Sequence, residues 1–95
     1  MSVIKINKGN FQNEVINSES TVLLDFYADW CGPCRMVSLI VDEIAEERAD
    51  IKVEESELAE RFGIFSIPAL VVIKDGKIVN QAVGARPKAQ ILAML

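Results

Sequence analysis

Apolar and polar residues follow one another along this chain in blocks whose internal spacing predicts strands and helices in turn. The opening stretch at 2–7, SVIKIN, predicts a short first strand. Residues 21–28, TVLLDFYA, are β-branched, aromatic and nearly continuous in apolar character, as expected of a central strand covered on both faces. Asp25 is the polar exception within that strand.

Three further stretches have helical spacing. Between the first two strands, Phe11, Val15 and Ile16 lie on one face behind Asn10, a possible helix cap. Residues 33–48 predict the longest helix, because apolar residues recur there at spacings of three and four. The acidic residues within 42–47 fall on its other side and are expected to form a solvated face. Residues 86–95 predict a final helix with Pro87 near its first turn.

The remaining pattern at 69–83 predicts a hairpin. Asp75-Gly76 stands between two apolar runs there, and this dipeptide is favoured in tight antiparallel turns. The order strand, helix, strand, helix, strand, helix, hairpin, helix predicts an α/β fold over a single domain, 1–95, with a mixed central sheet sandwiched between helices. The crossover from the strand at 21–28 to the helix at 33–48 should be right-handed.

Composition limits the function. With 95 residues, 51% hydrophobic and 25% charged, the chain should form one soluble globular domain, and no apolar run approaches a membrane span. Its net charge of −4 argues against a nucleic-acid partner. The start, MSVIKINKGN, lacks the succession of a secretion signal, so we expect a cytoplasmic protein, monomeric and without a membrane partner.

The two cysteines are the candidate reactive groups. Cys31 and Cys34 fall where the strand at 21–28 ends and the longest helix begins. A helix N-terminus stabilises a thiolate, so the pKa of Cys31 should be lowered and Cys31 should attack as the nucleophile. Cys34 lies one turn further in and should be the shielded, resolving thiol. Gly32 permits a tight approach, and Pro33 presets the helical φ.

A zinc site is the alternative interpretation of this pair. The chain has no histidine and no third cysteine, so a monomer cannot supply four soft ligands. Dithiol chemistry needs neither a metal nor an organic cofactor. We therefore favour redox chemistry.

Three stretches, DFYADWCGPCRM, FSIPALVVIKDGK and VGA, resemble the thioredoxin family in order and spacing over most of the chain. The resemblance implies a thioredoxin fold and a general protein disulfide reductase, recharged by thioredoxin reductase with electrons from NADPH. It also implies that Asp25 relays protons to Cys34 and that the Ile67-Pro68 peptide is cis beside the disulfide. The substrate groove would be formed by Trp30, Gly32, Pro33, Ile67, Pro68 and Gly84.

Plainer interpretations exist for several of these residues. Asp25 could be a poorly paired acid at a strand end, although its apolar neighbours favour a buried carboxyl with a raised pKa and a role in proton transfer. Trp30 could serve packing alone. Pro68 would be trans on general grounds, so the cis peptide depends on the resemblance. Gly84 could simply end a strand.

The chain departs from the family pattern in two places. Leu39 stands where the family usually has a kinking proline, so the longest helix should run straighter. At 51–53 only a three-residue apolar stub precedes the charges, where the family has a full central strand and its turn, about half a dozen residues more. Either the protein has a true deletion there, or it has residues between Val53 and Glu54 that the sequence shown here omits. We expect such an omission, because 56–62 resumes the family pattern. Lys52 is the only candidate for the family's buried lysine facing Asp25.

Two other functions remain open. The protein could be a dedicated electron donor to one reductase, or a binding subunit that holds a partner in the groove around Trp30 and Pro68. A pure binder needs no vicinal cysteines, so the intact WCGPC favours the enzyme.

Overall fold

The computed structural model describes residues 3–56 and 66–95. Along the chain they form the elements β1 (Ile4–Ile6), η1 (Gln12–Ile16), β2 (Thr21–Phe26), α1 (Gly32–Glu47), β3 (Ile51–Ser56), β4 (Ala69–Lys74), β5 (Lys77–Val83) and α2 (Lys88–Met94). The helix predicted between the third strand and the hairpin lies outside the described residues.

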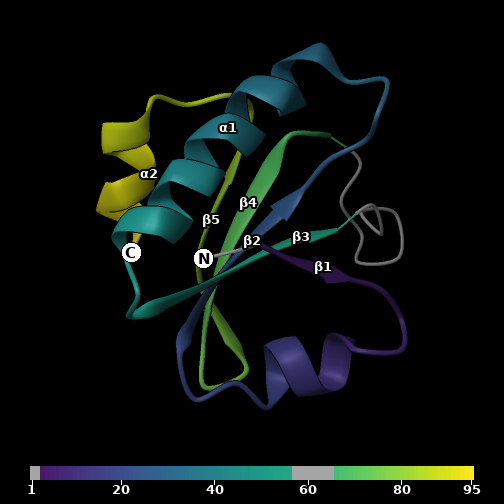
Figure 1. The fold of residues 1–95 in the computed structure, drawn as a ribbon, viewed down its shortest axis with the longest axis vertical. Coiled ribbons are helices and arrows are strands. Elements are labelled where there is room, and N and C mark those ends of the chain that lie inside the picture. The colour runs from purple at the N-terminus through teal and green to yellow at the C-terminus, as the bar shows by residue number, and fades with distance from the viewer. Residues whose placement is uncertain (1–2, 57–65) are drawn as a thin grey trace.

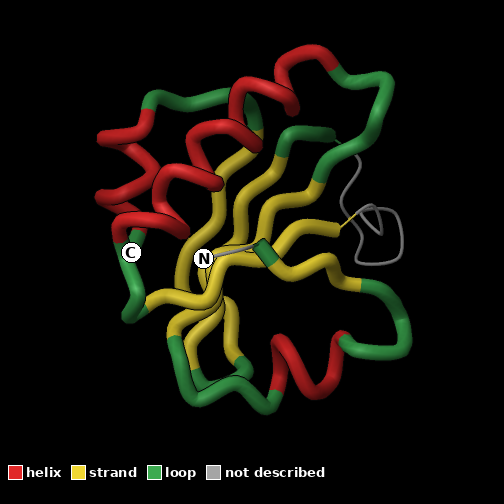
Figure 2. Tube along the Cα trace, viewed as in Figure 1, coloured by secondary structure: helices red, strands yellow, loops and turns green. Residues whose placement is uncertain are grey.

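The five strands form one mixed sheet in the order β1-β3-β2-β4-β5 (Figure 1). β3 pairs in parallel with β1 and β2, whereas β4 is antiparallel to both β2 and β5. The helices α1 and α2 lie on one side of the sheet and η1 lies on the other, which both ribbon and tube views show (Figures 1 and 2). The α/β sandwich predicted from the sequence is therefore confirmed.

Each face of the sheet has its own apolar core. On the α1 side, Val37, Val41 and Ile44 of the helix pack against the sheet residues Leu23 and Val72 and are fully buried with them. On the η1 side, the buried set comprises Val15 of η1 and the strand residues Ile6, Val22, Leu24, Phe26, Ala69, Val71 and Ile73. β2 contributes to both cores, which explains its nearly continuous apolar sequence.

The hairpin and the longest helix were both predicted from local signals, and the structure contains both. Asp75 and Gly76 have φ angles of 53° and 76°, the left-handed conformation that a two-residue hairpin turn requires. The helix α1 begins one residue before the predicted start and runs without interruption to Glu47. Asn10, in contrast, does not cap η1. Its side chain instead accepts from the Asn7 N–H and donates to the Lys5 carbonyl, which closes the turn after β1.

The expectation that the third strand is only a three-residue stub, 51–53, is wrong. β3 continues through Glu54 and Glu55 to Ser56 and pairs with β2 at six successive positions. Val53 and Glu54 are in register with Leu23 and Leu24 of β2, so the strand continues past the apolar stub into the charged residues. Pairing on both sides, with β1 and β2, holds these charged residues in a strand that their own side chains do not favour.

Side chains of β3 alternate between the two faces of the sheet. Val53 is in register with Leu23 and belongs to the α1-side core, so Lys52 and Glu54 face the η1 side. The Lys52 Nζ atom lies 2.8 Å from a carboxylate oxygen of Glu14 in η1. Lys52 is therefore on the wrong face to pair with Asp25, and its assignment as the buried lysine is wrong.

Candidate active site

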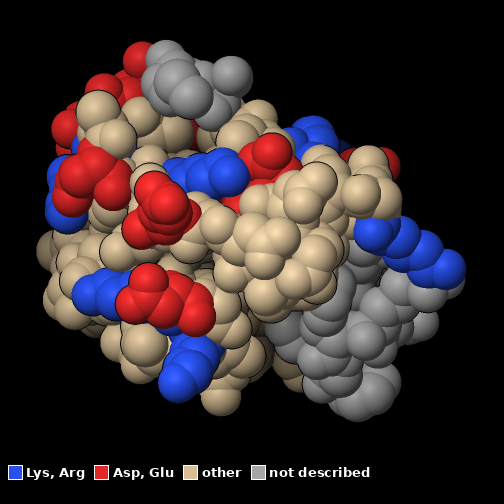
Figure 3. Space-filling model, turned by 90° about the horizontal axis from the view of Figure 1, so that it is seen from below, with Lys and Arg blue, Asp and Glu red and all other residues tan. Residues whose placement is uncertain are grey.

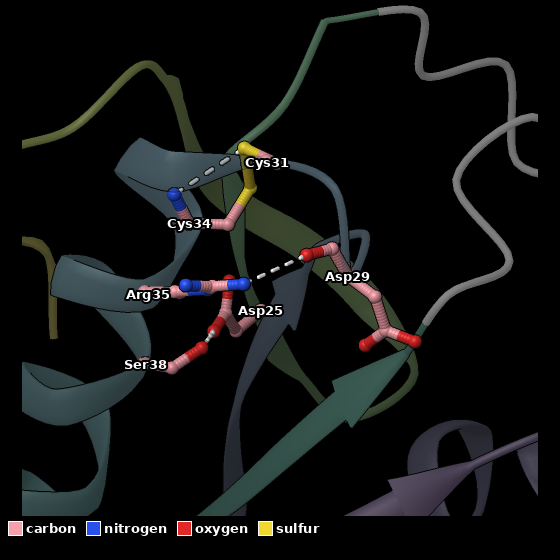
Figure 4. Close-up of a disulfide and its surroundings, with 6 residues drawn as sticks. All are labelled: Asp25, Asp29, Cys31, Cys34, Arg35 and Ser38. Carbon is pink, nitrogen blue, oxygen red and sulfur yellow. Dashed lines mark hydrogen bonds between the residues drawn. A yellow bond between two sulfur atoms is a disulfide. The ribbon is translucent and has the colours of Figure 1, made fainter.

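The two cysteines meet at the N-terminus of α1. Cys31 is the N-cap residue of that helix, with an extended backbone, and its Sγ accepts a hydrogen bond of 3.3 Å from the Cys34 N–H. The Cα atoms are 5.3 Å apart and the two sulfur atoms form a disulfide (Figure 4). Pro33 occupies the first turn, where its missing N–H leaves no intrahelical bond unmade.

The two sulfur-bearing residues differ in accessibility. Cys31 is 6% exposed, whereas Cys34 is 1% exposed. Gly32 and Pro33, which separate them, are both exposed. In the reduced protein, a Cys31 thiolate would lie at the positive end of the α1 dipole with the Cys34 N–H directed at it, which favours the ionised form.

Asp25 is fully buried beneath this helix end. Its Oδ2 atom accepts a hydrogen bond of 3.3 Å from the Ser38 hydroxyl, and its Oδ1 atom has no partner among the residues that the structure describes (Figure 4). The pKa of Asp25 is raised to about 7, chiefly by burial and next by the charge of Glu55, while the Ser38 hydrogen bond acts against both. A carboxyl group with such a pKa can take up or release a proton near neutral pH.

The structure adds residues that the sequence analysis missed. Glu55 of β3 is in register with Asp25, at the place where a lysine was sought. Lys5 of β1 lies 3.3 Å from the Glu55 carboxylate and donates a hydrogen bond of 2.6 Å to the Tyr27 hydroxyl. Because β3 was expected to stop before these charges, no sequence signal placed Glu55 or Lys5 near the cysteines.

A groove of about 650 Å³ lies beside these groups. Its lining includes Lys5, Tyr27, Asp29, Cys34 and Glu55. Arg35 also lines the groove and donates to the Asp29 carbonyl over 3.5 Å (Figure 4). The resolving cysteine and the second carboxylate therefore share one solvent-facing recess.

The expected groove residues gather at the same edge of the sheet. Ala69 pairs with Phe26 on one side and with Val83 on the other, so Pro68 and Gly84 lie at the end of β2 that leads to the cysteines. The Gly84 N–H donates to the Pro68 carbonyl over 2.7 Å. Gly84 has a φ of 97°, a conformation that favours glycine, so it does more than end a strand.

Ile67 and Trp30 complete this edge. The Ile67-Pro68 peptide is cis, as the resemblance implied. Ile67 is half-buried. The Trp30 side chain is 83% exposed, which excludes a role in packing alone. The disulfide is thus accompanied at one edge by an exposed aromatic ring and a proline.

Within residues 3–56 and 66–95, no cluster of three or more His, Cys, Asp or Glu side chains is arranged to hold a metal ion. No helix in these ranges is long and apolar enough to cross a membrane. A vicinal dithiol on an α/β sheet, with a buried acid behind it, defines a thiol-disulfide oxidoreductase.

Comparison with known proteins identifies the family. The thioredoxin family model matches residues 2–95. A thioredoxin of Pyropia yezoensis is 46% identical over 102 aligned positions, which cover 100% of this chain and 95% of the relative. A thioredoxin of Haemophilus influenzae is 42% identical, over 94% of this chain and 90% of the relative. A thioredoxin of Mycobacterium bovis is 43% identical, over 99% of this chain and 87% of the relative.

The chain belongs to the thioredoxin family. It is a thiol-disulfide oxidoreductase that reduces protein disulfides through its Cys-Gly-Pro-Cys pair. The alignment with the Pyropia protein has 102 positions against 95 residues here, so that relative has at least seven residues without a counterpart.

Proposed function

We propose that the two thiols divide the reaction between them. In the reduced protein the Cys31 thiolate attacks one sulfur of a target disulfide, forms a mixed disulfide and expels the other target sulfur as a thiolate. Cys34 then loses its proton, attacks the Cys31 sulfur and displaces the target as a dithiol. The protein is left with the Cys31–Cys34 disulfide, the state that the structure contains.

The observation that carries this assignment is the different placement of the two sulfurs. Cys31 caps the helix and is the more exposed residue, whereas Cys34 is buried within the first turn. A nucleophile must reach a protein substrate, and a resolving thiol must reach only its neighbour. The geometry therefore supports Cys31 as the attacking thiol and Cys34 as the resolving thiol.

Asp25 is proposed as the acid and base for Cys34. Its carboxyl lies below the disulfide in the view of Figure 4, beside the same turns of α1. With a pKa of about 7, a substantial fraction of Asp25 is ionised at neutral pH and able to accept the Cys34 proton. In the reverse direction the protonated acid returns it to the Cys34 thiolate.

The sheet edge around the disulfide is proposed as the substrate groove. The exposed ring of Trp30 provides an apolar contact for an incoming chain, and the exposed Gly32 and Pro33 allow its close approach. Ile67, Pro68 and Gly84 form the opposite side. Backbone recognition with few charged contacts suits a reductase that acts on many different proteins.

The proposed partners are disulfide-containing proteins and thioredoxin reductase, which would return electrons from NADPH. We place the protein in the cytoplasm as a single-domain monomer without a bound cofactor or metal. On the face seen in Figure 3, basic side chains are interspersed with acidic ones, a distribution that does not favour a nucleic acid.

The decisive experiment measures NADPH consumption with a thioredoxin reductase and insulin as a generic disulfide substrate. We expect consumption that requires all three proteins. A protein that is reduced by the reductase but leaves insulin intact would be a dedicated donor to another enzyme. A protein that binds a partner equally well with Cys31 and Cys34 both replaced by serine would be a binding subunit.

A further inference from the structure

Asp25 faces a second carboxylate across the sheet. β2 and β3 are parallel, and Asp25 and Glu55 are register partners, so their side chains lie on the same face, under α1. Both residues are buried: Asp25 is not exposed at all and Glu55 is 8% exposed. The negative charge of Glu55 opposes the ionisation of Asp25.

Lys5 distinguishes the two acids. It is in register with Glu55 on β1, and its Nζ atom lies 3.3 Å from the Glu55 Oε1 atom. The same ammonium group donates to the Tyr27 hydroxyl. The cation thus contacts Glu55 directly and acts on Asp25 only from a distance, whereas Asp25 has no cationic partner in contact with it among the described residues.

The 650 Å³ groove beside Cys34 shows the same difference between the two acids. Glu55, Lys5 and Cys34 line it, whereas Asp25 lies behind this lining. Other charged or titratable side chains facing the site come from α1 and from the turn after β2: Ser38 bonds Asp25, and Tyr27, Asp29, Arg35 and Asp42 line the groove. Of these, Asp42 acts on Asp25 in the same sense as Glu55 but more weakly, and β4 presents only Leu70.

We propose that Glu55 is a positioning residue of the resolving step, a second carboxylate that faces Asp25 across the β2–β3 pair and sets the pH at which Asp25 accepts the proton of Cys34. This inference rests on the role of Asp25 given above. Lys5 acts in the opposite direction, because it partly neutralises Glu55. The strength of the base that serves Cys34 is therefore adjusted by two residues that touch neither sulfur.

The test follows the resolving step directly. The reduced protein reacts with a chromogenic aromatic disulfide, whose first thiolate reports attack by Cys31 and whose second reports displacement by Cys34. We expect Glu55→Gln to move the midpoint of the second step's pH profile down by about one unit, the size typical of a lost neighbouring charge. Lys5→Met should move it upward. Glu55→Asp should restore most of the parent's midpoint.

A titration of the Asp25 carboxyl by ¹³C NMR in the oxidised protein provides a second readout that needs no activity. Glu19→Gln, an exposed site at the far end of β2, makes the same change in net charge and should shift neither measurement. The inference is overturned if Glu55→Gln leaves both midpoints where Glu19→Gln leaves them, or if Glu55→Gln and Lys5→Met shift them in the same direction. If Glu55→Gln does not fold, Lys5→Met decides alone: an upward shift of both midpoints supports the inference, and unchanged midpoints overturn it.

The two proposals fail in different ways. If Asp25 does not serve Cys34, the second thiolate release loses its dependence on Asp25, while the NMR titration still responds to Glu55. If Glu55 has no influence, the NMR midpoint stays in place while the parent protein still reduces insulin.

Discussion

Cys31 and Cys34 carry the same functional group, and their surroundings separate their roles. One caps a helix and lies near the surface, and the other is enclosed by the first turn of that helix. Asp25 acquires its chemistry in the same manner, since burial raises the pKa of an ordinary carboxyl to about 7.

The cysteine roles predict different outcomes for two matched substitutions. Cys31→Ser should abolish turnover, because no accessible nucleophile remains. Cys34→Ser should also stop turnover but should accumulate target proteins as mixed disulfides on Cys31. Non-reducing gel electrophoresis with insulin would separate the two results. Faster alkylation of Cys34 than of Cys31 in the reduced protein at mildly acidic pH would contradict the assignment.

Asp25→Asn should slow the resolving step about a hundredfold and leave the attack by Cys31 nearly unchanged, because the lost base serves only Cys34. In the parent protein the resolving rate should rise with pH through about 7, as Asp25 ionises, and the variant should lose this rise. Single-turnover kinetics between pH 5 and 9 would resolve both steps. Equal rates for parent and variant would reduce Asp25 to a structural residue.

At the scale of elements, β3 is the unusual strand. It places Glu54 on the η1 side of the sheet in register with Ile4 and Leu24, fully buried. Neither carboxylate oxygen of Glu54 has a hydrogen-bond partner among the described residues. Burial raises the pKa of Glu54 to about 7, and Lys52 opposes this only in part. An unpaired buried carboxyl costs free energy of folding wherever it must ionise.

Glu54→Leu should therefore stabilise the protein, and more at pH 8 than at pH 5. The folded-state pKa lies above the ordinary value of 4.5, so the native state holds the proton more tightly and loses stability as pH rises from about 4.5 to 7. The gain at pH 8 should be on the order of 3 kcal/mol. Urea unfolding of parent and variant at both pH values measures it. A gain independent of pH would show that Glu54 does not titrate in the folded protein.

β3 also shows what the sequence could and could not predict. The Asp75-Gly76 hairpin and the Cys31 helix start are local: a few adjacent residues determine the turn or cap, so the sequence predicted them. The extent of β3 depends on pairing with β1 and β2, which overrides the unfavourable charges of Glu54 and Glu55. The identity of the residue opposite Asp25 depends on that register, and therefore Glu55 was not foreseen and Lys52 was wrongly assigned.

At the scale of the whole molecule, two buried acids on opposite faces of one sheet act on the same equilibrium. Asp25 and Glu54 both have pKa values of about 7 in the folded protein, against ordinary values of 3.8 and 4.5. Each group bears its proton more tightly in the native state. The total stability of a small domain is only about 5–15 kcal/mol. The stability lost when both acids ionise is therefore a large fraction of that total.

The oxidised parent protein should consequently be most stable at mildly acidic pH. Its free energy of unfolding should fall by several kcal/mol between about pH 4.5 and 7.5 and then level off, because both carboxyls are ionised above that range. Chemical unfolding followed by circular dichroism across this range measures the decline. The double variant Asp25→Asn, Glu54→Leu should show little decline, and a profile as steep as the parent's would exclude these two acids as its cause.

The short first strand has a practical consequence for anyone who prepares this protein. β1 has three residues, lies at the edge of the sheet and pairs with β3 alone, yet it carries the lysine that neutralises Glu55. An affinity tag fused ahead of residue 1 adjoins this strand, and any disturbance of β1 would be transmitted to the acid behind the cysteines. Rates from amino-terminally tagged protein should therefore be compared with those from cleaved material before they are taken as the enzyme's own.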